Sequence, residues 1–207
     1  MSNLAANIAQ RLLQIKAIKL SPQNPFTWAS GKKSPIYCDN RIVLSYPRIR
    51  NEVIQGFVEE IQSKKFEKID GIVGVATAGI AHGALLASAL DLPFAYVRSK
   101  AKAHGRKNLL EGELPIGAKV VVIEDLISTG GSALNAVDAL RNVDIEVLSV
   151  GAIFTYGFPD AKKAFEKNNC DFFTLSNYTV LLQEAIKLNY ITDSDVEMLQ
   201  EWRQAHD

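Results

Sequence analysis

The chain has 207 residues, of which 47% are hydrophobic, so it is long enough for one domain with a sizeable core. Its 23 lysines and arginines balance its 23 aspartates and glutamates, which gives no argument for a nucleic-acid or anionic membrane partner. Cys38 and Cys170 are too few and too far apart for a disulfide framework or a metal knuckle. No apolar run approaches membrane length and the first residues lack a signal-peptide core, so we expect a cytoplasmic protein with reduced thiols.

The first 46 residues combine one helix with a segment that departs from the pattern of the remaining chain. Apolar residues recur at helical spacing over residues 4–15, which predicts an amphipathic helix. Residues 26–28 and 36–38 are strand-like runs on either side of a Ser-Gly-Lys-Lys turn at residues 30–33. We therefore expect these two runs to pair as a hairpin.

Regular alternation of helices and strands follows. Proline at position 47 is favoured in the first turn of a helix, and the inner face of this helix carries Ile49, Val53, Phe57 and Ile61. Beyond residue 69 the predicted strands are 72–75, 94–97, 120–123, 147–154 and, at the edge, 172–175. The predicted helices are 80–90, one from about residue 132, 161–167, 180–188 and one capped near Thr192. Such alternation predicts a mainly parallel sheet with helices on both faces, and ligands of such sheets bind beyond the carboxyl ends of the strands.

The segment between Val97 and Lys119 interrupts this alternation, and a gap of about twenty residues without a helical pattern is typical of a functional lid or a disordered loop. Every second residue in its first part is basic or histidine: Arg98, Lys100, Lys102, His104 and Arg106. Period-two spacing places all five on one face of an extended strand, and residues 109–111 can return as the second strand of a flap. A cationic flap suits a polyanion such as pyrophosphate. The alternative is a solvated basic loop or one that binds nucleic acid, and the lack of interleaved aromatic residues disfavours nucleic acid.

The stretch from Lys119 to Ser132 is the most informative part of the chain. Its apolar run, residues 120–123, is typical of a strand buried on both faces of a parallel sheet. The run stops at two carboxylates, Glu124 and Asp125, and a loop of small and hydroxylated residues follows before a helix begins near Ser132. The order is therefore strand, acidic pair, phosphate-sized loop and helix N-terminus.

Each part of this stretch has a chemical reason. Glycines allow backbone N–H groups to approach a ligand, and a helix N-terminus carries partial positive charge, so the loop suits a phosphate monoester. No Gly-Lys-Ser/Thr follows, which argues against a nucleoside triphosphate cradle. The adjacent Glu124 and Asp125 can accept hydrogen bonds from sugar hydroxyls and stabilise positive charge on a ribose ring. Together these parts describe a ribose 5-phosphate site, whereas an ordinary βα turn with a solvated strand end is the simpler alternative.

This stretch resembles the signature of the type I phosphoribosyltransferases. The motifs Arg98-Ser-Lys-x-Lys-x-His-Gly and Phe26-Thr-x-x-Ser-Gly-x-x-Ser-Pro make essentially the whole chain similar to the orotate phosphoribosyltransferase family. The resemblance implies a single α/β domain over residues 1–207, with a central, mainly parallel sheet flanked by helices. It also implies a small N-terminal hood, formed mainly by about residues 1–46, and a flexible β-flap over about residues 98–113.

The same resemblance implies an activity in pyrimidine biosynthesis. Orotate displaces pyrophosphate from phosphoribosyl diphosphate (PRPP) to give orotidine 5′-monophosphate, and Mg²⁺ enters on the pyrophosphate with no metal site of the protein's own. The resemblance further implies a homodimer, in which the flap of each subunit covers the active site of its partner. Carried over by position, the catalytic residues are Lys102, His104 and Asp125. The substrate-binding residues are Arg98, Lys102, His104, Glu124, Asp125, Leu126, Ile127, Ser128, Thr129, Gly130, Gly131 and Ser132.

The chain departs from the family pattern at two positions. Some members have a lysine in the loop where Ala78 stands and an arginine where Tyr156 stands. Recognition of the orotate carboxylate must then depend on backbone donors or on Lys32, Lys33 or Arg41, and the sequence does not choose among them.

Three other functions remain open at this point. A phosphoribosyltransferase for another base would share the loop at 124–132 but lack the cationic flap. A non-enzymatic regulator on the same fold would use the pocket to sense a nucleotide, and a plain nucleotide-binding module would release no pyrophosphate. A nucleophilic triad is not among the alternatives, because His82 and His206 have no suitable neighbours in the sequence.

Overall fold

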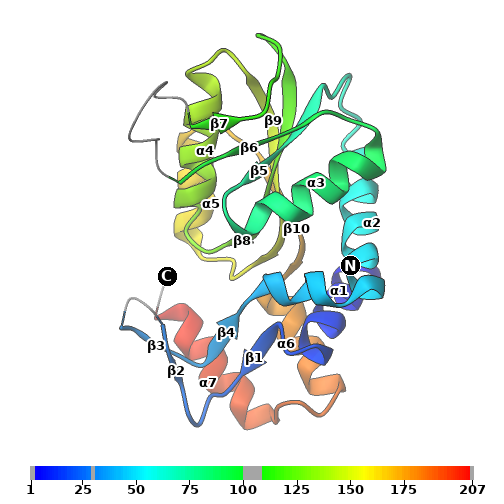
Figure 1. Cartoon of the computed structure of the whole chain (residues 1–207). Coiled ribbons are helices and arrows are strands. Elements are labelled where there is room, and N and C mark those ends of the chain that lie inside the picture. Colours follow the sequence, from blue (N-terminus) through cyan, green and yellow to red (C-terminus); the bar gives the residue numbers. More distant parts are fainter. Residues whose placement is uncertain (1–2, 29–30, 100–108, 206–207) are drawn as a thin grey trace.

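A six-stranded sheet forms the centre of the computed structural model, which describes residues 3–28, 31–99 and 109–205 (Figure 1). Its strand order is β10-β9-β8-β5-β6-β7, and every neighbouring pair is parallel except β6 with β7. The strands are β5 (Gly71–Val75), β6 (Phe94–Val97), β7 (Leu110–Glu111), β8 (Lys119–Ile127), β9 (Glu146–Thr155) and β10 (Phe172–Asn177). The predicted α/β class and the edge position of the last strand are confirmed.

Helices cover both faces of this sheet (Figure 1). Alternate residues of β8 belong to different cores: Val121 and Ile123 pack with α2 (Pro47–Ser63) and α3 (Ala78–Leu90). Val120 and Val122 pack with α4 (Gly131–Arg141) and α5 (Pro159–Lys167) on the other face. Because both faces of the strand are covered, its side chains are apolar without alternation, as a central parallel strand requires.

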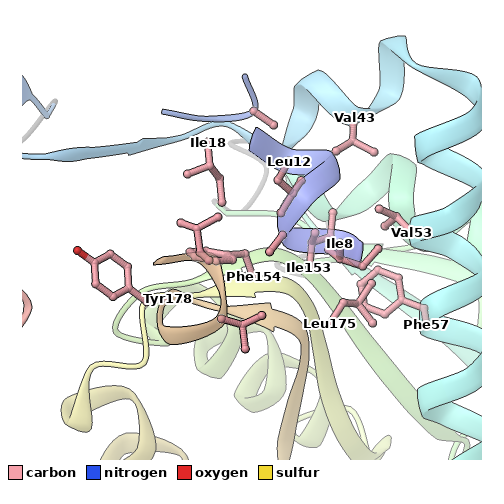
Figure 2. Packing of buried hydrophobic residues seen from close by; sticks show 14 of the residues in the cluster. Ile8, Leu12, Ile18, Val43, Val53, Phe57, Ile153, Phe154, Leu175 and Tyr178 are labelled. Atoms are coloured by element: carbon pink, nitrogen blue, oxygen red, sulfur yellow. The ribbon is translucent and has the colours of Figure 1, made fainter. Parts of the chain in front are cut away.

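The N-terminal and C-terminal segments pack together below the sheet (Figure 1). Helix α1 (Asn3–Gln14) contacts α6 (Tyr178–Lys187) and β10, and α7 (Asp193–Gln204) follows after a capping box at Thr192. Figure 2 shows Ile8 and Leu12 of α1 beside Phe154 and Leu175 of the sheet. These side chains are at most 1% exposed, so the hood and the sheet share one hydrophobic core.

The predicted hairpin pairing is wrong. Strand β2 (Phe26–Thr27) pairs with β3 (Lys33–Ser34), whereas β4 (Ile36–Cys38) pairs with β1 (Ile18–Leu20), a strand that the sequence analysis missed. The physical reason is burial. Ile18 of β1 and Ile36 of β4 are fully buried in the shared core, so both strands lie against this core and beside each other. A short 3-10 helix, η1 (Asn40–Ser45), then leads into α2.

Strand β8 is also longer than predicted. It continues through both carboxylates to Ile127 and pairs with β9 as far as Thr155, so Glu124 and Asp125 lie within the strand and not after it. Among the helices of the described residues, we find none with the length and apolar character needed to cross a membrane.

Candidate active site

The acidic pair lies at the carboxyl end of β8, where the predicted site was expected. Glu124 is only 5% exposed, and Asp125 is half-buried. The Oε1 atom of Glu124 accepts a hydrogen bond from the backbone N–H of Asp125 at 3.1 Å, and its Oε2 atom accepts one from Ser132 Oγ at 2.9 Å. The carboxylate of Glu124 is therefore held on both oxygens.

A buried asparagine supports the pair from behind. Asn40, at the start of η1, is fully buried, and its Nδ2 donates to the backbone carbonyl of Asp125 at 2.7 Å. Asn40 also lies close enough to His82 of α3 and Cys38 of β4 to influence the pKa of each side chain. This contact joins the hood to β8 across 85 positions of sequence, and no motif indicated it.

Burial makes the two carboxylates costly to ionise. Desolvation, followed by the charge of Asp125, raises the pKa of Glu124 to about 8. Desolvation also raises the pKa of Asp125, against the opposing effects of a hydrogen bond with Glu124 and of the nearby Arg41. Because burial opposes their ionisation, two adjacent carboxylates in such a site gain most from a ligand that brings positive charge.

The loop after β8 has the features of an anion site. Gly130 is the N-cap of α4 with φ of 84°, a conformation that favours glycine, and no side chain caps the helix. Gly131 has open space where a side chain would stand. Ser128 is half-buried and Thr129 is exposed. Uncapped N–H groups at a helix start, with room in front of them, suit a phosphate.

The loop after β5 is built differently. The peptide between Ala76 and Thr77 is cis, and α3 begins at once with Ala78. A Cβ atom at Gly79 would overlap the carbonyl oxygen of Ile123, so the helix start lies directly on β8. The loop that holds Ala78 therefore contacts β8 through backbone atoms.

The described base of the flap carries one of the predicted cations. Arg98 donates through its backbone N–H to Leu109 at 2.9 Å and contacts Glu111 through Nη1 at 3.3 Å. It lines a cavity of about 380 Å³ together with Ala76 and Ser132. Lys102 and His104 fall outside the described residues.

The candidates for a carboxylate of the base have different surroundings. Arg41 forms a two-point ion pair with Asp39, at 2.7 and 3.0 Å, and its charge acts on Asp125. Lys33 instead donates to Thr27 at 2.7 Å in the exposed hairpin. Arg41 is thus the cation nearer to the acidic pair.

Tyr156, which stands where some family members have arginine, belongs to the core. It is 3% exposed and packs in an aromatic cluster with Trp28, Phe158 and Trp202, with ring centroids 5.4 to 6.3 Å apart. His82 is fully buried, and desolvation lowers its pKa to about 4, so neutral imidazole fills space between α3 and η1. His206 lies outside the described residues.

The sequence analysis predicted no side chains of this protein as metal ligands, because the resemblance implies that Mg²⁺ enters on the pyrophosphate. Within residues 3–28, 31–99 and 109–205, no group of three or more histidine, cysteine, aspartate or glutamate side chains is arranged to hold a metal ion. The donor set at the site is two adjacent carboxylates, and Glu124 is already hydrogen-bonded on both oxygens.

Known proteins are similar to this chain in sequence and in fold. A family model described as phosphoribosyl transferase domain matches residues 43–186. A protein of Phocaeicola vulgatus named orotate phosphoribosyltransferase is 55% identical over 203 residues, which cover 98% of this chain and 95% of that protein. One of the same name from Porphyromonas gingivalis is 53% identical over 205 residues, covering 99% and 97%. The crystal structure of orotate phosphoribosyltransferase from Aeropyrum pernix is 25% identical with a TM-score of 0.77, covering 89% of this chain and 99% of that one.

Proposed function

The chain belongs to the orotate phosphoribosyltransferase family, and on that premise we propose that it transfers the 5-phosphoribosyl group of PRPP to orotate, a step of pyrimidine biosynthesis. The products are orotidine 5′-monophosphate and pyrophosphate. The observation that carries the proposal is the meeting of an acidic pair and an uncapped helix start at one edge of the sheet. These two features fit the hydroxyls and the 5-phosphate of a single ribose phosphate.

The chemistry follows from the charges at this edge. A ribosyl carbon that loses pyrophosphate develops positive charge, and the nearby carboxylates Glu124 and Asp125 stabilise it more than they stabilise the neutral ground state. The backbone of residues 128–131 holds the 5-phosphate, which fixes the ring against the acidic pair. No side-chain nucleophile is required by this mechanism.

We propose that Mg²⁺ enters the site bound to the pyrophosphate of the substrate. Mg²⁺ keeps several waters and is commonly held by one or two carboxylates plus substrate phosphates. The donor set described above suits an ion that the substrate mainly holds. When bound, the ion neutralises charge on the departing pyrophosphate.

We also propose that the protein is a cytoplasmic homodimer in which Arg98, Lys102 and His104 of each flap serve the partner's site. The two free cysteines, Cys38 and Cys170, support a reducing compartment. Flap sharing has a direct test in mixed dimers of Lys102→Ala and Asp125→Asn chains. Each parent dimer is expected to be nearly inactive, and random exchange should restore about a quarter of wild-type activity, because half of the dimers then hold one intact site. Activity that stays at the parental level after demonstrated exchange would refute flap sharing.

The reaction itself is tested by the absorbance of orotate on addition of PRPP and Mg²⁺. We expect orotate to be consumed with an equal amount of pyrophosphate released. Consumption of another base but not orotate would identify a different phosphoribosyltransferase. Binding of nucleotide without turnover would identify a sensor or a binding module.

A further inference from the structure

One hydroxyl of the proposed phosphate loop is engaged by the acidic pair. Ser132, the second residue of α4, donates from Oγ to Glu124 Oε2 at 2.9 Å. Glu124 is 5% exposed, whereas Ser132 is an exposed residue that lines the cavity shared with Arg98 and Ala76. The hydroxyl therefore stands between the buried carboxylate and the open cavity.

A hydroxyl has a single proton to donate. While Ser132 donates it to Glu124, that proton is not available to a phosphate oxygen. The loop has other donors for a phosphate: the half-buried Ser128, the exposed Thr129 and the uncapped N–H groups at the start of α4. The loop can thus bind an anion without the hydroxyl of Ser132.

We propose that Ser132 is a positioning residue, whose hydroxyl holds Glu124 in its working orientation and is not itself a ligand of the 5-phosphate. The inference rests on the proposed function, and it changes the role that the family resemblance implies for this serine. The proposal also gives the two carboxylates different roles. Both oxygens of Glu124 are held, by Ser132 and by the backbone of Asp125, whereas Asp125 is only half-buried and is the more accessible of the two to a substrate.

The hydrogen bond from Ser132 also favours the ionised form of Glu124, against the effects of burial and of Asp125, so it lowers the pKa of this carboxyl. Other charged and titratable groups lie around the pair on the elements packed against it, and each would stay in place in a Ser132 variant. They are Asp39 and Arg41 beside η1, Cys38 of β4, Tyr156 after β9, His82 of α3 and Arg98 at the flap base.

The test compares Ser132→Ala with Ser132→Thr, which keeps the hydroxyl, and with Ser128→Ala as the matched loss of a loop hydroxyl. For Ser132→Ala we expect kcat to fall at least about tenfold, the lower end of the loss for one hydrogen bond to a charged group, with KM for PRPP within about twofold of wild type. The bend on the acid side of the kcat/KM profile should move to higher pH, because a bond that lowers the pKa of Glu124 is gone. The substrates are the same for every variant, so their own ionisation cancels.

The conservative Ser132→Thr should restore both kcat and the position of the bend. Ser128→Ala should instead raise KM for PRPP and leave the bend where it is. Titration with inorganic phosphate gives a readout without turnover, and Ser132→Ala should bind it as wild type does.

Two results would overturn the proposal. One is a higher KM for PRPP and weaker phosphate binding in Ser132→Ala with an unmoved bend, which would make Ser132 a phosphate ligand. The other is an unchanged kcat and profile in Ser132→Ala, which would leave it no role in positioning. Absence of orotate consumption by the wild-type protein would instead refute the proposed function, while the phosphate titration still reports on Ser132.

Discussion

Two glycine-bearing turns lie side by side at the carboxyl edge of the sheet, and one is tightly packed whereas the other is open. The turn after β5 brings Gly79 so close to β8 that a Cβ atom would overlap the carbonyl oxygen of Ile123. The turn after β8 leaves open space at Gly131, and its helix begins without a side-chain cap. One glycine is there for packing between backbones, and the other leaves room for a ligand.

The difference shows how this edge is built. Gly74 and Gly83 are packed as closely as Gly79. A Cβ atom at Gly74 of β5 would lie 2.9 Å from the backbone of Gly79 in α3, and one at Gly83 of α3 would lie 3.3 Å from the backbone of Gly74. These small residues let α3 lie directly on β5 and β8 and hold Glu124 from one side. The turn after β8 can then remain open, because the packed turn beside it supplies rigidity.

The largest effect is expected from Gly79→Ala. The added methyl group meets backbone, which cannot rotate away, so α3 must shift from β8. Overpacking of this kind costs about 3 kcal/mol or more in the free energy of unfolding. Chemical denaturation measures it, with Ala78→Gly in the same turn as a control that changes helix propensity by about 1 kcal/mol without adding atoms. Wild-type stability in Gly79→Ala would show that the turn after β5 is not tightly packed against β8.

The sheet was predictable because buried parallel strands are continuous apolar runs. Residues 94–97 were predicted as a strand and form β6 with the same bounds. The strand pairing in the hood was not predictable, since β1 and β4 have three residues each and are too short to show a period. Their pairing depends on burial of Ile18 and Ile36 in a core shared with distant segments.

The candidate site also has a part that was predictable from the sequence and a part that was not. Glu124, Asp125 and the loop that follows are contiguous in sequence, and the structure keeps them together at one edge. The length of β8 was underestimated because charged residues read as a strand end, although pairing with β9 continues past them. Asn40 could not be predicted, because a hydrogen bond to a backbone carbonyl has no sequence pattern. The roles assigned to the site residues stay predictions.

The second prediction concerns the open turn and its acidic pair. Asp125→Asn keeps the shape of the side chain but removes the charge that faces the developing positive charge. A charged hydrogen bond contributes about 1.5–3 kcal/mol, so kcat should fall about 10- to 150-fold while affinity for PRPP changes much less. Steady-state kinetics with orotate and PRPP measures the two effects. Turnover near the wild-type value would show that this carboxylate does not act on the ribose.

The third prediction is a pH dependence of stability from Glu124. Its pKa is raised in the folded protein to about 8, from an ordinary value of 4.5, so the folded state binds the proton more tightly than the unfolded state. Stability should therefore fall as pH rises from about 4.5 to about 8. Glu124→Gln removes this fall, and each unit of the shift corresponds to about 1.4 kcal/mol.

Melting temperatures of wild type and Glu124→Gln at pH 5 and pH 8.5 test this sign. The advantage of the variant should be larger at pH 8.5. Glu146→Gln, a change of an exposed carboxylate at the opposite end of the sheet, should show little difference between the two pH values. A variant that gains stability equally at both would mean that the charge of Glu124 is not costly in the fold.

The smallest effect on stability is expected from Gly131→Ala, which is the counterpart of Gly79→Ala at the other turn. Gly131 meets no atom within 4 Å of an added Cβ, and its backbone lies outside the left-handed region, so alanine fits. Alanine in place of glycine at a compatible position stabilises a protein by about 0.4–1 kcal/mol, because it restricts the unfolded chain.

If the open space is where the 5-phosphate binds, the same methyl group should weaken PRPP binding even as the melting temperature stays level or rises. Calorimetric titration and thermal melts on one preparation separate the two quantities. Unchanged affinity in Gly131→Ala would place the phosphate elsewhere, and a loss of stability like that of Gly79→Ala would mean that both turns are packed alike.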